Sequence, residues 1–334
     1  MGYADMPVEQ ARRHTTSVEP PPDLWQFWDE TVAASRAKAV TPSLEQVQTG
    51  LTRVVTRDVR FSGFDGERIA AWLHVPQGVS DPPVVVRFWG YGRGRGLAHE
   101  VPLWTNAGFA VLAVDMRGQG GQYGAGDTPD PHGSGPSHPG FLTKGIAEPS
   151  SYYYRRLMTD AALAVDAVHH LPGIDPGAVV AVGGSQGAGI AIAAAALNPH
   201  KVTGVMADVV FLSDVPRALQ ITGTDPYGEL SRFLKSQHGM AQQAMATLSY
   251  FDVAVLAGRA TAPAIFSVGM MDPICPPSTV YAAFNAYAGP KEIHEYPYSG
   301  HEGGGPWQEQ VQLRWLHGLT STPVTDDSPS EETP

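Results

Sequence analysis

A serine, an aspartate and a histidine, each expected where a predicted strand ends, are the residues best suited to chemistry. Ser185 lies in Gly183-Gly184-Ser185-Gln186-Gly187, between an apolar run at 179–182 and an alanine-rich stretch to 197. This pattern predicts a strand, a sharp turn and a helix. The turn would expose the serine hydroxyl and aim the Gln186 amide, with the positive helix end, at the atom under attack. The same five residues also occur as an ordinary glycine-rich connection, so the rest of the chain must decide.

Asp272 and His301 supply the two groups that a serine nucleophile needs. A base takes the serine proton, and a carboxylate fixes the tautomer of that base and stabilises its charged form. Asp272 follows a predicted strand at 264–269, and His301 follows the next one at 292–296. Both would stand at carboxyl ends of strands, where open parallel sheets collect their ligands. The order Ser, Asp, His is that of an α/β-hydrolase.

Each of these assignments has a competitor. His294 falls inside the last predicted strand, where we expect a structural role. Asp208 and Asp214 flank the strand before a long insertion and are alternative acids, although Asp272 is favoured. Cys275, the single cysteine, has no second feature that marks a nucleophile, so we expect a small buried thiol near the site.

A second glycine-rich loop is the candidate for the other half of an oxyanion hole. The predicted strand 84–89, which ends in Trp89, runs into Gly90-Tyr91-Gly92-Arg93-Gly94-Arg95-Gly96. Such a loop frees backbone amides beside the nucleophile turn, and we assign the second donor to the Tyr91 amide. The alternative is a flexible loop whose two arginines hold nothing.

The remaining pattern predicts an α/β fold with a mostly parallel central sheet flanked by helices. Asp23 is expected to cap a helix to about residue 39 that forms a lid or clamp over the core. Alternating residues at 54–61 and 68–75 predict an antiparallel pair at the sheet edge, and a helix at about 98–107 would join two parallel strands. Residues 120–150 form a long loop, in which a surface position for His132 and His138 is favoured over a metal site.

Length and composition favour one large domain. No linker interrupts the 334 residues, so we expect an N-terminal arm and helix at 1–45, a catalytic domain at 46–319, and a disordered tail at 320–334. A segment at about 212–258 is expected to cap the site, and we expect Pro226 within it, together with Tyr91 and Trp89, to contact the substrate. The net charge of −11 without a basic cluster argues against nucleic acid or a membrane surface as partner and favours a neutral or cationic substrate. The N-terminus has no signal-peptide pattern, so the cytoplasm is the expected compartment.

Together the motifs resemble those of the acetyl xylan esterase and cephalosporin C deacetylase family, carbohydrate esterase family 7. The resemblance rests on motifs spread over nearly the whole chain except the tail: Phe-Trp-Gly-Tyr-Gly at 88–92, Arg-Gly-Gln at 117–119, Gly-Gly-Ser-Gln-Gly at 183–187, Asp272 with Cys-Pro-Pro at 275–277, His-Glu at 301–302, and Tyr-Tyr-Tyr-Arg-Arg at 152–156.

The resemblance implies an α/β-hydrolase fold, a triad of Ser185, Asp272 and His301, and oxyanion donors at Tyr91 and Gln186. It further implies no metal or other cofactor, deacetylation of short acetylated xylo-oligosaccharides and related esters, and a homohexamer with sites that open to an internal cavity. Trp89, where the family often has histidine, is a departure that could reshape the acyl pocket. A peptidase of the same fold and a non-catalytic ligand-binding relative stay open as alternatives.

Overall fold

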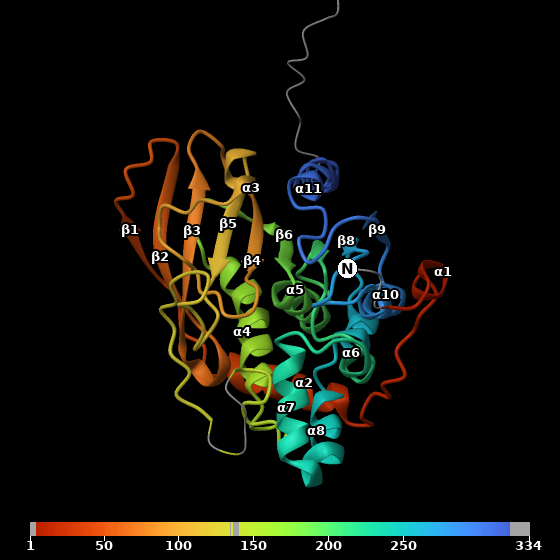
Figure 1. The fold of residues 1–334 in the computed structure, drawn as a ribbon. Coiled ribbons are helices and arrows are strands. Elements are labelled where there is room, and N and C mark those ends of the chain that lie inside the picture. The colour runs from red at the N-terminus through yellow and green to blue at the C-terminus, as the bar shows by residue number, and fades with distance from the viewer. Residues whose placement is uncertain (1–4, 134, 136–139, 321–334) are drawn as a thin grey trace, which may run out of the picture.

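A nine-stranded, mostly parallel sheet forms the centre of the molecule (Figure 1). The computed structural model describes residues 5–133, 135 and 140–320. In spatial order the strands are β1 (Ser43–Val47), β2 (Val54–Ser62), β3 (Arg68–Pro76), β5 (Ala110–Val114), β4 (Pro83–Phe88), β6 (Asp175–Gly184), β7 (Gly204–Asp208), β8 (Ala264–Gly269) and β9 (Lys291–Tyr296). The first three strands and β5 pair antiparallel, and every later pairing from β5 to β9 is parallel. The predicted fold class is therefore confirmed.

Helices cover both faces of the sheet. The helices are α1 (Val8–Ala11), α2 (Leu24–Arg36), α3 (Leu103–Asn106), α4 (Tyr153–Val168), α5 (Gln186–Leu197), α6 (Val215–Ile221), α7 (Tyr227–Ser236), α8 (Ala241–Leu248), α9 (Val253–Leu256), α10 (Pro277–Ala286) and α11 (Pro306–Thr320). One buried cluster joins α3 and α11 to one face, and a larger cluster joins α2, α4, α5 and α10 to the other. None of the helices in the described ranges is long and apolar enough to cross a bilayer.

The helix that follows the nucleophile turn is buried along its whole length. All twelve residues of α5 are buried. Because α5 is apolar on every side, it is stable only when neighbouring elements surround it, and it packs against β6, β7 and α4. The turn between β6 and α5 is thereby fixed at the centre of the sheet.

The N-terminal helix acts as a clamp and not as a lid, because no residue of α2 lines the cavity described below. The indole of Trp28 donates to the carbonyl of Tyr250 at 2.9 Å, and the Tyr250 hydroxyl donates to Asp23 at 2.6 Å. Asp23 therefore occupies the N-cap position without capping α2 through its side chain. These contacts tie the N-terminal segment to the end of the insertion at 212–258, which folds as α6 to α9.

Three elements differ from expectation. A strand that the sequence did not predict, β1, forms the sheet edge outside β2, and the expected boundary at residue 45 falls within it. The helix expected at 98–107 is wrong in length, because α3 begins only after Pro102 and comprises four residues. The sequence interpretation also missed α11, whose buried residues Gln308, Gln312 and Leu316 recur at intervals of four. The expected disordered tail and His138 lie outside the described residues, except for Thr320, which ends α11.

Candidate active site

The turn at Ser185 is strained, as a nucleophile elbow requires. Ser185 has φ 57° and ψ −120°, which is a rare conformation for a residue with a side chain. The surrounding backbone holds it there, since its amide donates to the Asp208 carbonyl at 2.8 Å. A Cβ at Gly183 would lie 2.2 Å from the carbonyl carbon of Gly187, and one at Gly187 would lie 2.4 Å from the Phe88 oxygen. Only glycine fits these two positions, because the backbone segments approach so closely.

His301 is paired with Asp272. The Nδ1 atom of His301 lies 2.8 Å from Asp272 Oδ2, and the other carboxylate oxygen accepts from the amides of Ile274 at 2.7 Å and Cys275 at 3.0 Å. The Asp272 side chain is fully buried, whereas that of His301 is 30% exposed. Because a carboxylate accepts hydrogen bonds, this arrangement puts the proton on Nδ1 and leaves Nε2 as the basic atom.

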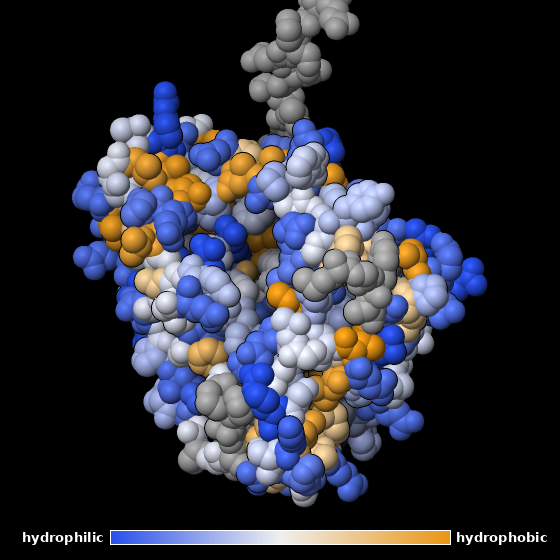
Figure 2. Space-filling view, in the orientation of Figure 1, coloured by the Kyte–Doolittle hydropathy of each residue, from blue (hydrophilic) through white to orange (hydrophobic). Residues whose placement is uncertain are grey.

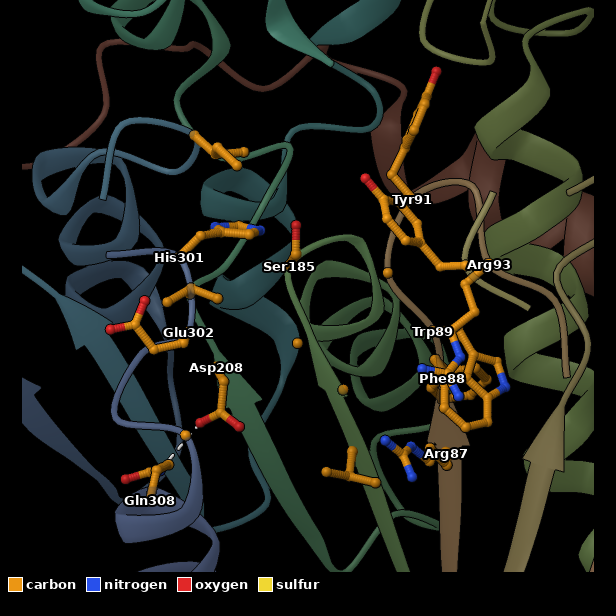
Figure 3. A pocket seen from close by; sticks show the side chains of 18 of the residues that line it. Arg87, Phe88, Trp89, Tyr91, Arg93, Ser185, Asp208, His301, Glu302 and Gln308 are labelled. Atoms are coloured by element: carbon orange, nitrogen blue, oxygen red, sulfur yellow. Dashed lines mark hydrogen bonds between the residues drawn. The ribbon is translucent and has the colours of Figure 1, made fainter. Parts of the chain in front are cut away.

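The imidazole of His301 points across the cavity toward the Ser185 hydroxyl (Figure 3). Within the described residues no hydrogen bond joins the two side chains, and the hydroxyl contacts Cys275 Sγ at 4.0 Å. Such contacts often tighten only when substrate is bound. Burial, together with the charge of Asp272, raises the pKa of the Cys275 thiol well above its usual value. Cys275 is therefore a protonated, fully buried neighbour of the site, as the sequence predicted.

A buried glutamine pair holds the two predicted oxyanion segments together. Gln119 accepts from the Gly92 amide at 2.7 Å and donates to the side-chain oxygen of Gln186 at 3.0 Å. The Gln186 side chain donates in turn to the Trp89 carbonyl at 3.2 Å. The loop after β4 is thus bonded to the first residue of α5. Among the described residues no acceptor is bonded to the amide of Tyr91 or of Gln186.

The side chain of Tyr91 fixes its own loop. Its hydroxyl donates to Glu229 Oε2 at 2.6 Å and accepts from the amides of Phe141 and, at 3.0 Å, Leu142. Burial, followed by the charge of Glu229, raises the pKa of Tyr91 far above its usual value, so the hydroxyl stays protonated and donates. Burial also raises the pKa of Glu229. Residues 141–142 and helix α7 are therefore hydrogen-bonded to the same Tyr91 hydroxyl.

Ser185, His301 and the Tyr91 loop open into one cavity of about 760 Å³. The cavity lies between the loop after β4 on one side and the His301 loop with α11 on the other (Figure 3), and this face of the molecule is hollowed near its middle (Figure 2). Trp89 and Pro226, both predicted to contact substrate, line it together with Tyr91, Ser185 and His301. The insertion contributes Asp225, Pro226 and Glu229, so it caps the cavity.

The competing residues have other partners. Asp208 accepts from Gln308 at 3.1 Å and Gln312 at 2.7 Å, and Asp214 accepts from Thr16 at 3.0 Å and pairs with His14. His132 pairs with Glu67. In the described part of the chain, one group could offer three metal ligands, namely Asp272, Cys275 and His301. Both carboxylate oxygens of Asp272 in this group already have partners, because Oδ1 accepts from the Ile274 and Cys275 amides and Oδ2 faces His301 Nδ1.

Comparison with known proteins identifies the family. A family model described as acetyl xylan esterase (AXE1) matches residues 1–319. The chain belongs to the acetyl xylan esterase family. The resemblance inferred from the motifs is therefore confirmed, and the family's α/β-hydrolase fold agrees with the sheet described above.

Solved structures and a curated relative resemble this acetyl xylan esterase family member. An acetyl xylan esterase from Paenibacillus sp. R4 is 35% identical with a TM-score of 0.87, and acetyl xylan esterase 1 from Thermoanaerobacterium sp. JW/SL YS485 is 30% identical with a TM-score of 0.86. Each comparison covers 94% of this chain and 99% of the other. Acetyl esterase Axe7A of Xylanibacter ruminicola is 30% identical over 181 residues, which are 53% of this chain. The match spans 39% of that relative's length.

Two residues that support the site were not predicted from the sequence. Gln119 was visible only as part of the Arg-Gly-Gln motif, and Glu229 was an unremarked acid in the insertion. Both act through other residues, Gln119 by bonding to Gln186 and Glu229 by bonding to Tyr91. A buried polar network between distant segments leaves no spacing pattern in the sequence.

Proposed function

We propose that this chain is a serine esterase that removes acetyl groups from small acetylated carbohydrates through an acyl-enzyme. The observation that carries the proposal is the strained Ser185 at the start of α5, with the His301–Asp272 pair facing it across a capped cavity. Family membership supplies the acetyl ester as the substrate class. The substrates that we propose are acetylated xylo-oligosaccharides and acetyl esters of the cephalosporin C type.

In this mechanism Ser185 Oγ attacks the ester carbonyl while His301 Nε2 takes its proton. The amides of Tyr91 and Gln186 donate to the oxyanion, and the positive end of α5 adds to this stabilisation. His301 then returns the proton to the departing alcohol oxygen, which leaves an acetyl group on Ser185. Water, deprotonated by the same nitrogen, attacks the acetyl carbonyl and releases acetate, and the proton returns to Ser185. Asp272 holds the imidazole and stabilises its charged form throughout.

The test replaces Ser185 and measures ester hydrolysis and folding separately. Ser185→Ala should abolish hydrolysis of 4-nitrophenyl acetate and acetylated xylose while the circular dichroism spectrum and unfolding midpoint stay near those of the wild type. A fluorophosphonate should label the wild-type protein at Ser185 and leave the variant unlabelled. Wild-type turnover in the variant would refute the assignment. An unlabelled wild-type protein that still binds acetylated sugar would instead indicate a ligand-binding relative.

We also propose, from family membership, that the chain assembles as a homohexamer and acts in the cytoplasm. Tyr298 and Trp307 lie near His301 in the chain and are 92% and 73% exposed, and an interface would cover such side chains. Light scattering on the purified protein measures the assembly directly. A monomer at micromolar concentration would contradict the hexamer and leave the catalytic proposal intact.

A further inference from the structure

Two arginines in the cavity wall have no anionic partner among the residues that the structure describes. The guanidinium carbon of Arg87, on β4, lies 4.0 Å from the centroid of the Trp89 ring, and that of Arg93, in the next loop, lies 4.1 Å from it. Arg87 also lies 5.2 Å from the Trp104 ring. Across the residues that the structure describes, neither guanidinium takes part in an ion pair or a hydrogen bond. Arg87 and Arg93 are partly buried, whereas the fully buried arginines of the described residues each pair with at least one carboxylate: Arg95 with Asp58, Arg117 with Asp160, and Arg156 with Asp130.

This arrangement is electrostatically unfavourable unless an anion completes it. Both cations lie against the same indole, so they repel each other. Burial, followed by the charge of Arg93, lowers the pKa of Arg87 to about 10. Contact with the aromatic face offsets part of the free-energy cost of holding the two charges there. The remainder is what a bound anion would relieve.

Among the described residues, none of the acids that line the cavity forms an ion pair with Arg87 or Arg93. Four have hydrogen-bonded partners of their own: Asp208 with Gln308 and Gln312, Glu229 with Tyr91, Asp225 with Arg232, and Glu302 with the Gly300 amide. The fifth, Glu309, is exposed on α11. Its charge partly opposes the lowering of the Arg87 pKa, but its carboxylate does not come within ion-pair distance of that side chain. The two guanidinium groups beside Trp89 are therefore cations that pair with no carboxylate of the described residues, in a chain whose net charge is −11.

The arginine pair faces the cavity into which the nucleophile opens. Figure 3 shows Arg87, Trp89 and Arg93 on one side of this cavity and His301 on the other, with Ser185 between them. Arg93 follows Tyr91, the predicted oxyanion donor, by two residues. An acetyl group adds only one methyl beyond the reacting carbonyl, so most of a cavity of about 760 Å³ is left for the alcohol portion of the substrate.

We propose that Arg87 and Arg93 form an anion subsite that binds a carboxylate on the alcohol portion of the substrate, as in an acetylated uronic acid. The planar fork of a guanidinium matches the two oxygens of a carboxylate. The proposal rests on the proposed deacetylation and names its substrate class. It reverses the preference for neutral or cationic substrates inferred from net charge, because the field at the site is set by nearby groups.

The test compares two substrates that differ only in the anionic group. We would measure kcat/KM for methyl 2-O-acetyl-glucuronoside and methyl 2-O-acetyl-glucoside with the wild type, Arg87→Gln, Arg93→Gln and Arg53→Gln. Arg53 is exposed and outside the cavity, so its variant controls for the change in net charge. The wild type should prefer the glucuronoside. Each cavity variant should lower the ratio of the two values about tenfold, because a hydrogen bond to a charged group contributes about 1.5–3 kcal/mol. Arg53→Gln should leave the ratio unchanged.

A second measurement separates the subsite from the chemistry. Calorimetry with the deacetylated methyl glucuronoside and methyl glucoside reports binding without turnover, and the preference for the glucuronoside should weaken as salt rises. If neither ester were hydrolysed but the protein still bound the glucuronoside more tightly than the glucoside, the proposed function alone would be refuted. A wild-type ratio near one, or a ratio that the cavity variants and Arg53→Gln change equally, would overturn the subsite.

Discussion

Replacement of Tyr91 by Phe tests whether the predicted oxyanion loop is held by its own side chain. The change removes one oxygen atom, which donates to Glu229 and accepts from the amides of Phe141 and Leu142. A hydrogen bond to a charged group contributes about 1.5–3 kcal/mol, and each buried amide left without an acceptor costs about 1 kcal/mol or more. We therefore expect the free energy of unfolding to fall by about 3–5 kcal/mol.

Activity should fall as well, because the Tyr91 amide moves with its loop. Losing one oxyanion donor costs about 2.7–4 kcal/mol of barrier, so a loosened donor should lower kcat for 4-nitrophenyl acetate at least about tenfold. Urea unfolding and steady-state kinetics measure the two effects. Tyr123→Phe is the matched control, since Tyr123 lines the same cavity but is 65% exposed and its hydroxyl accepts from the exposed side chain of Gln122 at 3.1 Å. If Tyr91→Phe behaved like Tyr123→Phe in both assays, the anchoring argument would fail.

Three further predictions concern the elbow and its acids. Gly187→Ala places a Cβ 2.4 Å from the Phe88 carbonyl oxygen, so it should abolish soluble expression or lower the unfolding free energy by about 3 kcal/mol, whereas Gly184→Ala, with nothing within 4 Å, should fold normally. Asp272→Asn should lower kcat about 10⁴-fold by losing the correct histidine tautomer, whereas Asp208→Asn should retain most of the activity; the opposite ranking would identify Asp208 as the triad acid. Burial raises the pKa of Asp208 to about 6, so folding favours its protonated form, and the stability that it contributes at low pH should be lost as pH rises through about 6. Urea unfolding from pH 4 to 7 should show the wild type losing about 2–3 kcal/mol relative to Asp208→Asn, and parallel pH profiles would contradict this.

Local patterns were enough to predict much of the site. The turn at Ser185 is encoded within five residues, because glycine is the only residue type that permits the close backbone approach seen at positions 183 and 187. Asp272 and His301 each follow a strand whose apolar run is plain in the sequence, and parallel strands bring their carboxyl ends to one edge. Motif and strand order together were therefore sufficient to anticipate the His301–Asp272 pairing.

Weak local signals explain the elements that were missed. The strand β1 has only partly buried or exposed residues, and it forms because β2 offers a free edge. The helix α11 buries two glutamines, Gln308 and Gln312, which polarity alone places on a surface. They are buried because Asp208, distant in the chain, accepts their hydrogen bonds.

The sequence by itself determined the fold class, the family and the residues available for catalysis, because short-range sterics and strand order are written in local residue types. Only the tertiary structure decided which charges are neutralised. Arg93 and Arg95 stand two residues apart in one glycine-rich loop, yet Arg95 pairs with Asp58, while Arg93 lies over an indole and pairs with no carboxylate in the described part of the chain. Charge pairing depends on contacts between segments far apart in the chain, and sequence spacing does not record those contacts.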